Sequence, residues 1–114
     1  MEYYIKDIKK AEFEGKEIEL NGFVNSIRKG KNNSFLILRD PSGTIQCVSH
    51  STDKSFQDVN KITRESAIKI KGKLRKDERA EGGYEIAIED LNIYSIAEPY
   101  PLKKGHKKVF LLYP

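Results

Sequence analysis

Apolar and polar residues alternate along five stretches of this chain, and each stretch predicts a β-strand with one buried face. The predicted strands are Glu17–Arg28, Phe35–Asp40, Thr44–His50, Ala67–Leu74 and Tyr84–Tyr94. Within the last stretch the alternation changes parity before Leu91, and such a change predicts a β-bulge.

The segments between the strands have the composition of turns and loops. Lys29–Ser34 (KGKNNS) predicts a turn, and Asp40–Gly43 (DPSG) has proline and glycine where a tight turn favours them. Lys76–Gly83 predicts a charged loop that ends in two glycines. The first three strands should therefore follow one another closely in space.

Two segments follow a helical rather than an alternating period. Tyr4–Lys10 has Tyr4, Ile5 and Ile8 at helical spacing and predicts a short N-terminal helix. Thr52–Ile62 predicts a second helix, with Thr52 or Asp53 as its cap and with one apolar face. That face would consist of Phe56, Val59 and Ile62.

The predicted order of elements is strand, strand, strand, helix, strand, strand. This order is typical of the all-β, five-stranded OB-fold barrel, which binds oligonucleotides on its second and third strands and adjoining loops. Gly22 and Gly72 lie inside strands, where a small closed barrel must bend sharply. We expect one OB-fold domain over residues 1–98, with a short N-terminal helix. Residues 99–114 should form a basic hinge or linker tail.

Composition places the chain among globular proteins and excludes several classes. Its 114 residues suit a single domain, and no run of 18 apolar residues predicts a membrane span. The first residues lack the apolar segment of a signal peptide. The single cysteine, Cys47, excludes an intrachain disulfide and should be a small buried thiol. We therefore expect a cytoplasmic protein without membrane contact.

The net charge of +4 is unevenly distributed. Residues 1–20 sum to −2, residues 21–50 to +3, residues 51–80 to +4, and residues 81–100 to −5. Lys103, Lys104, Lys107 and Lys108 supply the excess. A basic middle suits a surface that follows a phosphate backbone, although ordinary solvated lysines would give the same pattern.

Three residues on the predicted strands could recognise an unstacked base. If Leu36 and Leu38 face the interior, Phe35 lies on the outer surface and offers a stacking face. The opposite assignment would make Phe35 a core residue. Gln46, whose amide both donates and accepts, could lie near Phe35, and Glu85 has outward parity on the last strand. Each of these polar residues could also be an ordinary surface side chain.

Two groups of cations flank these positions and could contact RNA phosphates. The first group surrounds the turn after the first strand, and the second lies at the end of the fourth strand and in the following loop. The groups comprise Arg28, Lys29 and Lys31, and Lys73, Arg75, Lys76 and Arg79. Arginine can in addition stack on a base.

The chain has no recognisable catalytic or metal-binding motif. His50 and His106 lack cysteine or carboxylate neighbours at metal-ligand spacing, and no glycine-rich phosphate loop is present. We therefore expect no catalytic residue, no metal and no cofactor in this chain.

The spacing F-x-x-x-R-D-x-x-G-x-x-Q, from Phe35 to Gln46, resembles a known family. That family is the N-terminal anticodon-binding OB domain of class II aminoacyl-tRNA synthetases of the aspartyl, asparaginyl and lysyl group. The resemblance extends over roughly residues 18–112 and includes further segments. These are Gly22-Phe23-Val24, Arg28, Glu65-Ser66 to Gly72, and Gly83-Tyr84-Glu85-Ile86.

The resemblance implies a partner and roles for the candidate residues. The partner would be a tRNA anticodon stem-loop with uridine as its middle base. Phe35 would stack on that uridine, Gln46 and Glu85 would recognise its edge, and Arg28 would also contact the anticodon.

The tail narrows the resemblance. Tyr100-Pro101-Leu102, Lys104-Gly105-His106 and Phe110-Leu111-Leu112 are similar to the hinge of asparaginyl enzymes, with aspartyl next and lysyl third. Phe23 stands where many relatives have tryptophan, and Gly105 where the hinge usually has glutamate. The class II motifs for ATP and the amino acid are missing, so ATP and Mg²⁺ would belong to an absent catalytic domain. An isolated domain should be monomeric or only weakly associated.

Two other functions fit the same residues. The chain could be a free-standing single-strand-binding OB protein without anticodon preference. It could also be a protein-interaction module whose sheet face docks a partner.

Overall fold

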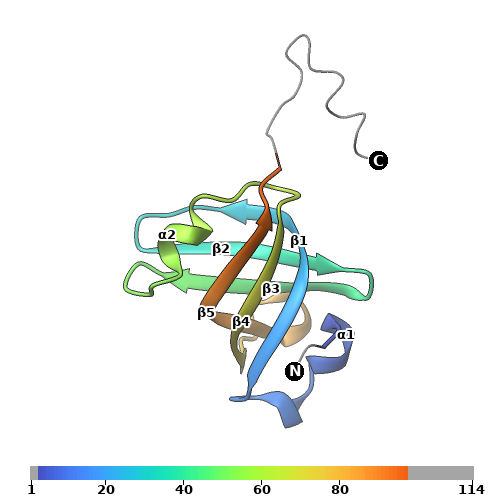
Figure 1. The fold of residues 1–114 in the computed structure, drawn as a ribbon. Coiled ribbons are helices and arrows are strands. Elements are labelled where there is room, and N and C mark those ends of the chain that lie inside the picture. Colours follow the sequence, from blue (N-terminus) through green and yellow to red (C-terminus); the bar gives the residue numbers. More distant parts are fainter. Residues whose placement is uncertain (1–2, 98–114) are drawn as a thin grey trace.

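Five strands close into a barrel in the computed structural model, which describes residues 3–97 (Figure 1). They are β1 (Glu17–Arg28), β2 (Asn33–Asp40), β3 (Gly43–His50), β4 (Ala67–Lys76) and β5 (Tyr84–Ser95). Their order around the barrel is β1-β2-β3-β5-β4, with β3 and β5 parallel and the other neighbours antiparallel. The predicted OB-fold barrel is confirmed.

The interior of the barrel consists of the apolar sides of the predicted strands. Leu36 is 1% exposed and Leu38 fully buried, so their neighbours Phe35 and Ile37 lie on the outer face of β2. The assignment of Phe35 to the core is therefore wrong. Ile68, Ile70 and Leu74 are fully buried on β4, as the alternation predicts.

Two strands, β2 and β4, are longer at one end than the sequence indicates. β2 begins at Asn33, inside the predicted turn, because Asn33 pairs with His50 across the β2–β3 ladder. β4 continues to Lys76, which pairs with Tyr84. Ladder pairing with a neighbouring strand thus extends both strands into segments whose composition alone favours a loop.

The N-terminal helix α1 (Ile5–Ile8) is shorter than the predicted Tyr4–Lys10, and a 3₁₀ turn, η1 (Ala11–Phe13), follows it. Ile5 and Ile8 are fully buried, whereas Tyr4 is 57% exposed and does not share their face. A helix this short is stabilised by its packing on the barrel rather than by its own hydrogen bonds.

The second helix, α2 (Phe56–Val59), is also shorter than the predicted Thr52–Ile62. The predicted cap at Thr52 or Asp53 is wrong, because the helix begins at Phe56 with Ser55 at the N-cap position. The Asp53 carboxylate accepts instead from the backbone N–H of His50 at 2.9 Å, in the turn that follows β3. Val59 and Ile62 are buried as expected. In the view of Figure 1, α1 and α2 lie on opposite sides of the barrel.

The predicted bulge in the last strand is confirmed. Lys71 pairs with Asp90 and Gly72 with Ile88, so Glu89 is the extra residue. A second irregularity, between Val24 and Ser26 on β1, has no signal in the sequence pattern. Beyond the Lys76–Tyr84 pair at the end of the ladder, the short 3₁₀ turn η2 (Glu81–Gly83) leads into β5.

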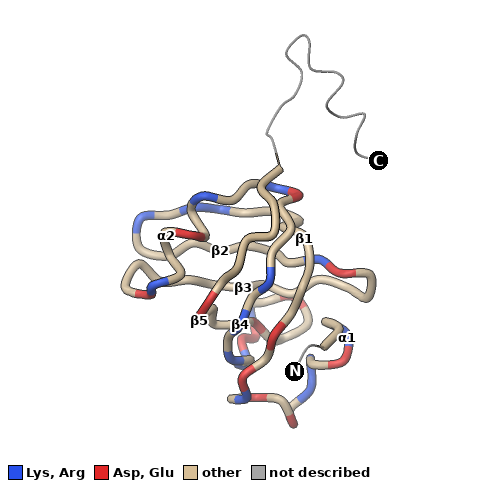
Figure 2. The backbone as a smooth tube through the Cα atoms, viewed as in Figure 1, with Lys and Arg blue, Asp and Glu red and all other residues tan. Residues whose placement is uncertain are grey.

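Charges on the barrel are partly paired across strands. Basic positions follow β4 and the turn between β1 and β2, while acidic positions lie along the first half of β1 (Figure 2). Lys69 and Lys71 on β4 lie 3.3 and 3.8 Å from the carboxylates of Glu19 and Glu17 on β1. The uncompensated basic surface is therefore at the strand ends and loops rather than along the whole of β4.

Two remaining expectations concern the C-terminal end of the chain and contact with a membrane. The predicted boundary at residue 98 and the predicted hinge or linker tail, residues 99–114, lie outside the described residues. None of the helices in the described part has the length and apolarity needed to cross a bilayer.

Candidate nucleic-acid interface

The outer face of β2 carries an aromatic ring beneath a guanidinium group. Arg28 on β1 and Phe35 on β2 are directly opposed in the ladder, and the guanidinium carbon lies 4.9 Å from the ring centroid. Phe35 is half-buried and Arg28 is exposed. The pair forms a cation–π contact at the surface, where an unstacked base could also use the ring.

Beside this pair the surface is hollowed. A depression of about 250 Å³ is lined by Arg28, Phe35, Ile37 and Gln46 among others. Ile37 pairs with Gln46 across the β2–β3 ladder, and Phe35 lies two residues from Ile37 on the same face. Gln46 is therefore close to Phe35, as predicted, and the two residues are diagonal neighbours on one surface of the sheet.

A row of side chains on the outer face of the barrel begins with Arg28, Phe35 and Gln46. From Gln46 this row continues across two more strands, β5 and β4. Gln46 on β3 is opposite Glu85 on β5, and Glu85 is opposite Arg75 on β4. The Gln46 amide donates through Nε2 to Glu85 Oε1 at 2.9 Å, and Arg75 donates through Nε to Glu85 Oε2 at 2.5 Å. One carboxylate thus joins the amide and the guanidinium.

Glu85 differs from the exposed surface carboxylate that its outward parity predicts. The residue is only 4% exposed, although it points away from the barrel interior. Its hydrogen-bond partners Gln46 and Arg75 flank it on the neighbouring strands. A carboxylate this deeply buried requires such donors to offset the cost of its desolvation.

The contact with Glu85 determines how Gln46 presents its amide. Because a carboxylate only accepts hydrogen bonds, the NH₂ group of Gln46 must point toward Glu85. The Gln46 carbonyl oxygen is then the atom available to the other side, where the depression next to Phe35 lies. This arrangement offers an acceptor to a base edge that carries an N–H.

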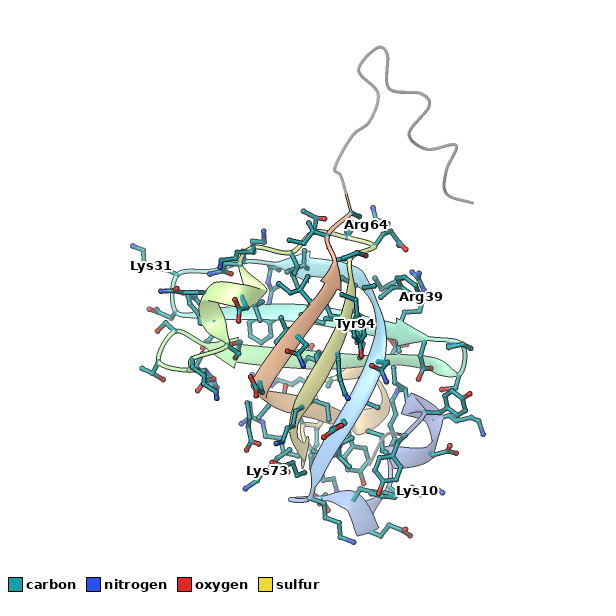
Figure 3. All side chains as sticks on the ribbon, viewed as in Figure 1. Lys10, Lys31, Arg39, Arg64, Lys73 and Tyr94 are labelled. Atoms are coloured by element: carbon teal, nitrogen blue, oxygen red, sulfur yellow. The ribbon has the colours of Figure 1, made fainter. Side chains whose placement is uncertain are left out.

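The predicted phosphate-binding cations lie at the two loops that flank the row. Lys29 and Lys31 are exposed at the β1–β2 turn, and Lys73 and Lys76 are exposed at the end of β4. Figure 3 shows Lys31 and Lys73 at separate edges of the barrel. The row from Arg28 to Arg75 runs from one of these loops to the other, so a polyanion that lay along it could touch both.

The β4–β5 loop is less basic than its lysines and arginines suggest. Arg79 Nε lies 3.5 Å from Asp77 Oδ1, and the hydrogen bond from the Arg79 backbone N–H lowers the pKa of the Asp77 carboxyl. An open pocket of about 640 Å³ here is lined by Arg75, Arg79, Asp77 and Glu85 among others. Charges of both signs face that pocket.

A second aromatic–arginine pair was not predicted as a contact. The Arg39 guanidinium lies 5.6 Å from the Phe23 ring centroid and makes two hydrogen bonds to the Glu65 carboxylate, at 2.8 and 3.1 Å. These bonds raise the pKa of Arg39 and lower that of Glu65. Figure 3 shows Arg39 and Lys31 at opposite ends of β2, so this cluster is separate from the row. Arg39 and Glu65 are 26 positions apart, and no local sequence pattern predicts a contact between them.

Two further expectations concern reactive groups. Across the described residues, no group of three or more histidine, cysteine or carboxylate side chains could hold a metal ion. Cys47 is fully buried, and this burial raises the pKa of its thiol far above its usual range.

A family model for an OB-fold nucleic acid binding domain, of the tRNA anticodon type, matches residues 18–94. The match includes the whole row from Arg28 to Glu85.

The curated relatives are longer proteins. The asparagine–tRNA ligase of Symbiobacterium thermophilum is 43% identical over 105 residues, which is 89% of this chain and 24% of that protein. The aspartate–tRNA(Asp) ligase of Picrophilus torridus is 39% identical over 104 residues, again 24% of that protein. The chain spans about a quarter of the length of the curated relatives it matches.

Solved structures show the same barrel. The asparaginyl-tRNA synthetase of Pyrococcus horikoshii, solved with asparaginyl-adenylate, matches with a TM-score of 0.79 at 28% identity, over 95% of this chain and 25% of that one. The OBody AM3L15, solved bound to hen egg-white lysozyme, matches with a TM-score of 0.77 at 18% identity, over 89% of this chain and 95% of that one. The second likeness shows the fold alone.

Proposed function

The chain belongs to the family of OB-fold nucleic-acid-binding domains of the tRNA anticodon type, and on this premise we propose that it reads the middle base of a tRNA anticodon. It would do so as the anticodon-binding part of an asparaginyl-tRNA synthetase-like protein. The observation that supports this most strongly is the row of Arg28, Phe35, Gln46 and Glu85 across the outer face of the barrel.

The first step of recognition is stacking on Phe35. The ring is half-buried, so its outer face can accept a base without a rearrangement of the core. Arg28 lies over the ring and would either move aside or stack on the other face of the base. Stacking of one base on an aromatic ring contributes about 1–3 kcal/mol and tolerates any base. Stacking alone therefore does not discriminate.

Discrimination requires contacts to the base edge. The carbonyl oxygen of Gln46 would accept from the N3–H of uracil, whereas the corresponding N3 of cytosine is itself an acceptor and would be repelled. Glu85 fixes the Gln46 amide in this orientation and would recognise the base edge through it. A base-specific contact of this kind is worth about 1–3 kcal/mol.

The flanking cations would contribute affinity without specificity. Lys29 and Lys31 at one loop, and Lys73, Lys76 and Arg79 at the other, are exposed and could neutralise phosphates on either side of the bound base. Each phosphate neutralised on a single strand releases counterions and makes the slope of log affinity against log salt more negative by about 0.7.

The proposal includes a role for this domain within a longer, synthetase-like protein. Anticodon contacts would position the tRNA so that its acceptor end reaches a catalytic region, in which ATP and Mg²⁺ would be bound. Discrimination among tRNAs, rather than chemistry, would be the contribution of residues 18–94. We expect the domain by itself to be cytoplasmic and monomeric or only weakly associated.

The proposal is tested by binding to anticodon stem-loops with the anticodons GUU, GUC and UUU, and to a GUU loop whose middle uridine is replaced by cytidine. We expect the replacement to weaken binding by at least about 1 kcal/mol at two salt concentrations. The ranking of the first three loops would identify the preferred tRNA. Equal binding to all four loops would instead indicate a general single-strand binder. No binding at low salt would indicate a protein-interaction module.

A further inference from the structure

Arg75 has a partner that sets it apart from the other cations of the two loops. Its Nε donates to Glu85 Oε2 at 2.5 Å, and its side chain is 46% exposed while that of Glu85 is 6% exposed. The neighbouring cations Lys73 and Lys76 are exposed on the same strand. The guanidinium of Arg75 thus forms the outer cover of a buried carboxylate.

The hydrogen bond from Arg75 determines where the Glu85 carboxylate lies. With Oε2 held by Arg75 on β4, Oε1 is directed toward β3, where it accepts from Gln46 Nε2 at 2.9 Å. The chain of contacts therefore runs from a guanidinium through a carboxylate to the amide beside Phe35. A change at Arg75 can alter the orientation of the Gln46 amide although the two residues are on strands separated by β5.

We propose that Arg75 is a positioning residue for base recognition: it fixes Glu85, and Glu85 in turn fixes the Gln46 amide with its carbonyl oxygen toward the base. The sequence alone predicts a phosphate contact for Arg75. This inference rests on the proposed function, because the base that Gln46 reads is the middle base of the anticodon. Loss of Arg75 would reduce the preference for uridine more than the overall affinity for RNA.

Replacement of Arg75 by lysine distinguishes the proposed positioning role from a phosphate contact. Both side chains carry one positive charge, so lysine preserves a phosphate contact and its salt dependence. Lysine, however, has a methylene group where arginine has Nε, and so it cannot reproduce the bond from that atom to Glu85. Arg75→Lys therefore removes the positioning contact while it retains the charge.

The experiment compares wild type, Arg75→Lys and Arg75→Met with Lys73→Met as the matched control, because Lys73 lies two residues earlier on the same face of β4. Binding of the GUU loop and of its middle-cytidine variant is measured over a range of salt. In wild type we expect a preference for uridine of about fivefold or more, which corresponds to the difference of at least about 1 kcal/mol expected above. We expect Arg75→Lys to reduce it to below about threefold with an unchanged salt slope. The Lys73→Met preference should equal that of wild type.

The opposite pattern overturns the proposal. If Arg75→Lys retains the full preference, and Arg75→Met merely makes the salt slope less steep by about 0.7, Arg75 is a phosphate contact. This result differs from failure of the proposed function, in which wild type itself binds the uridine and cytidine loops equally.

A second measurement tests the positioning in the free protein. The side-chain amide resonances of Gln46, assigned by their loss in Gln46→Ala, are recorded in ¹⁵N-labelled protein. We expect both Arg75 variants to shift these resonances and to speed the exchange of the amide protons with water, while Lys73→Met leaves them unchanged. Gln46 resonances that are identical in wild type and in both folded Arg75 variants would overturn the proposal without any RNA measurement.

Discussion

Arg28 lies over Phe35, with its guanidinium carbon 4.9 Å from the ring centroid, and the two residues are directly opposed on β1 and β2. The stacking surface of the free protein is therefore already covered by a cation. A planar guanidinium can stack on a base as well as on a ring, so a bound base can lie between the two. This relationship makes Phe35 the first residue to test.

We expect Phe35→Ala to weaken binding of an anticodon stem-loop by about 1–3 kcal/mol, because a stacked base would lose its aromatic partner. The measurement is a titration followed by fluorescence anisotropy. Phe23→Ala is the matched control, since Phe23 is also a surface ring next to an arginine, Arg39. Equal losses in the two variants would show that Phe35 has no particular role in binding.

Replacement of Gln46 by glutamate should both abolish base reading and destabilise the fold. The new carboxylate would replace the amide that donates to the buried Glu85 at 2.9 Å. Two carboxylates in contact repel each other, so we expect the free energy of unfolding to fall by about 2 kcal/mol at pH 7. The loss should shrink at pH 4.5, where one proton can be shared.

The check for Gln46→Glu is urea unfolding at both pH values. Gln57→Glu, at an exposed position of α2, serves as the control and should unfold like wild type. A loss of stability that is the same at pH 7 and pH 4.5 would argue against carboxylate repulsion.

Glu65 predicts an acid-dependent part of the stability. Its hydrogen bonds from Arg39 lower its pKa in the folded state, so the stabilisation is present above the pKa of the unfolded chain and is lost as pH falls through the folded pKa. Because the Glu65 side chain is 50% exposed, we expect at most about 1 kcal/mol. Glu65→Gln should lower the melting temperature at pH 7, and the difference from wild type should shrink at pH 3. A difference independent of pH would contradict this account.

Gly72 is required by a close approach of two strands. A Cβ at this position would lie 2.2 Å from the carbonyl oxygen of Ala87, next to the bulge in β5. We expect Gly72→Ala to lower the free energy of unfolding by about 2 kcal/mol or more, because the backbone of β4 and β5 must separate to admit the methyl group. Thermal unfolding provides the measurement, with Lys73→Ala as the control. Equal melting temperatures for the two variants would show that the barrel adapts without cost.

Cys47 should be unreactive in the folded protein. The thiol is fully buried, and the burial raises its pKa, so the reactive thiolate is scarce and inaccessible. Iodoacetamide at pH 8 should modify it only in denaturant, as mass spectrometry would show. Rapid modification of the folded chain would indicate that the interior of the barrel opens readily.

The features that follow from the local pattern agree closely with the structure. The leucines of β2 lie inside, and the parity change before Leu91 is a bulge at Glu89. Both depend on the two-residue period of a strand, in which a side chain that must be buried determines the direction of its neighbours. The predicted helices extend too far at both places because the packing of a few isoleucine and valine side chains, not helix propensity, limits them.

Only part of the candidate site can be predicted from the sequence pattern. Strand parity and the family resemblance point to Phe35, Gln46 and Glu85, and the structure places them on one surface. The burial of Glu85 and its bond to Arg75 were not predicted. The three strands that carry Gln46, Glu85 and Arg75 become neighbours only when the barrel closes through the parallel pair β3 and β5.

By itself, the sequence determined the five strands, their inward faces, the OB-fold order and the family, because these depend on side-chain period and local spacing. Only the tertiary structure decided which outward residues became partners. Gln46 and Glu85 are 39 positions apart, and the closure of the barrel brings them to 2.9 Å. Outward parity specifies the face on which a side chain lies, whereas its burial and its hydrogen bonds depend on the strands beside it. For that reason a residue expected to be an exposed carboxylate is a buried one that orients an amide.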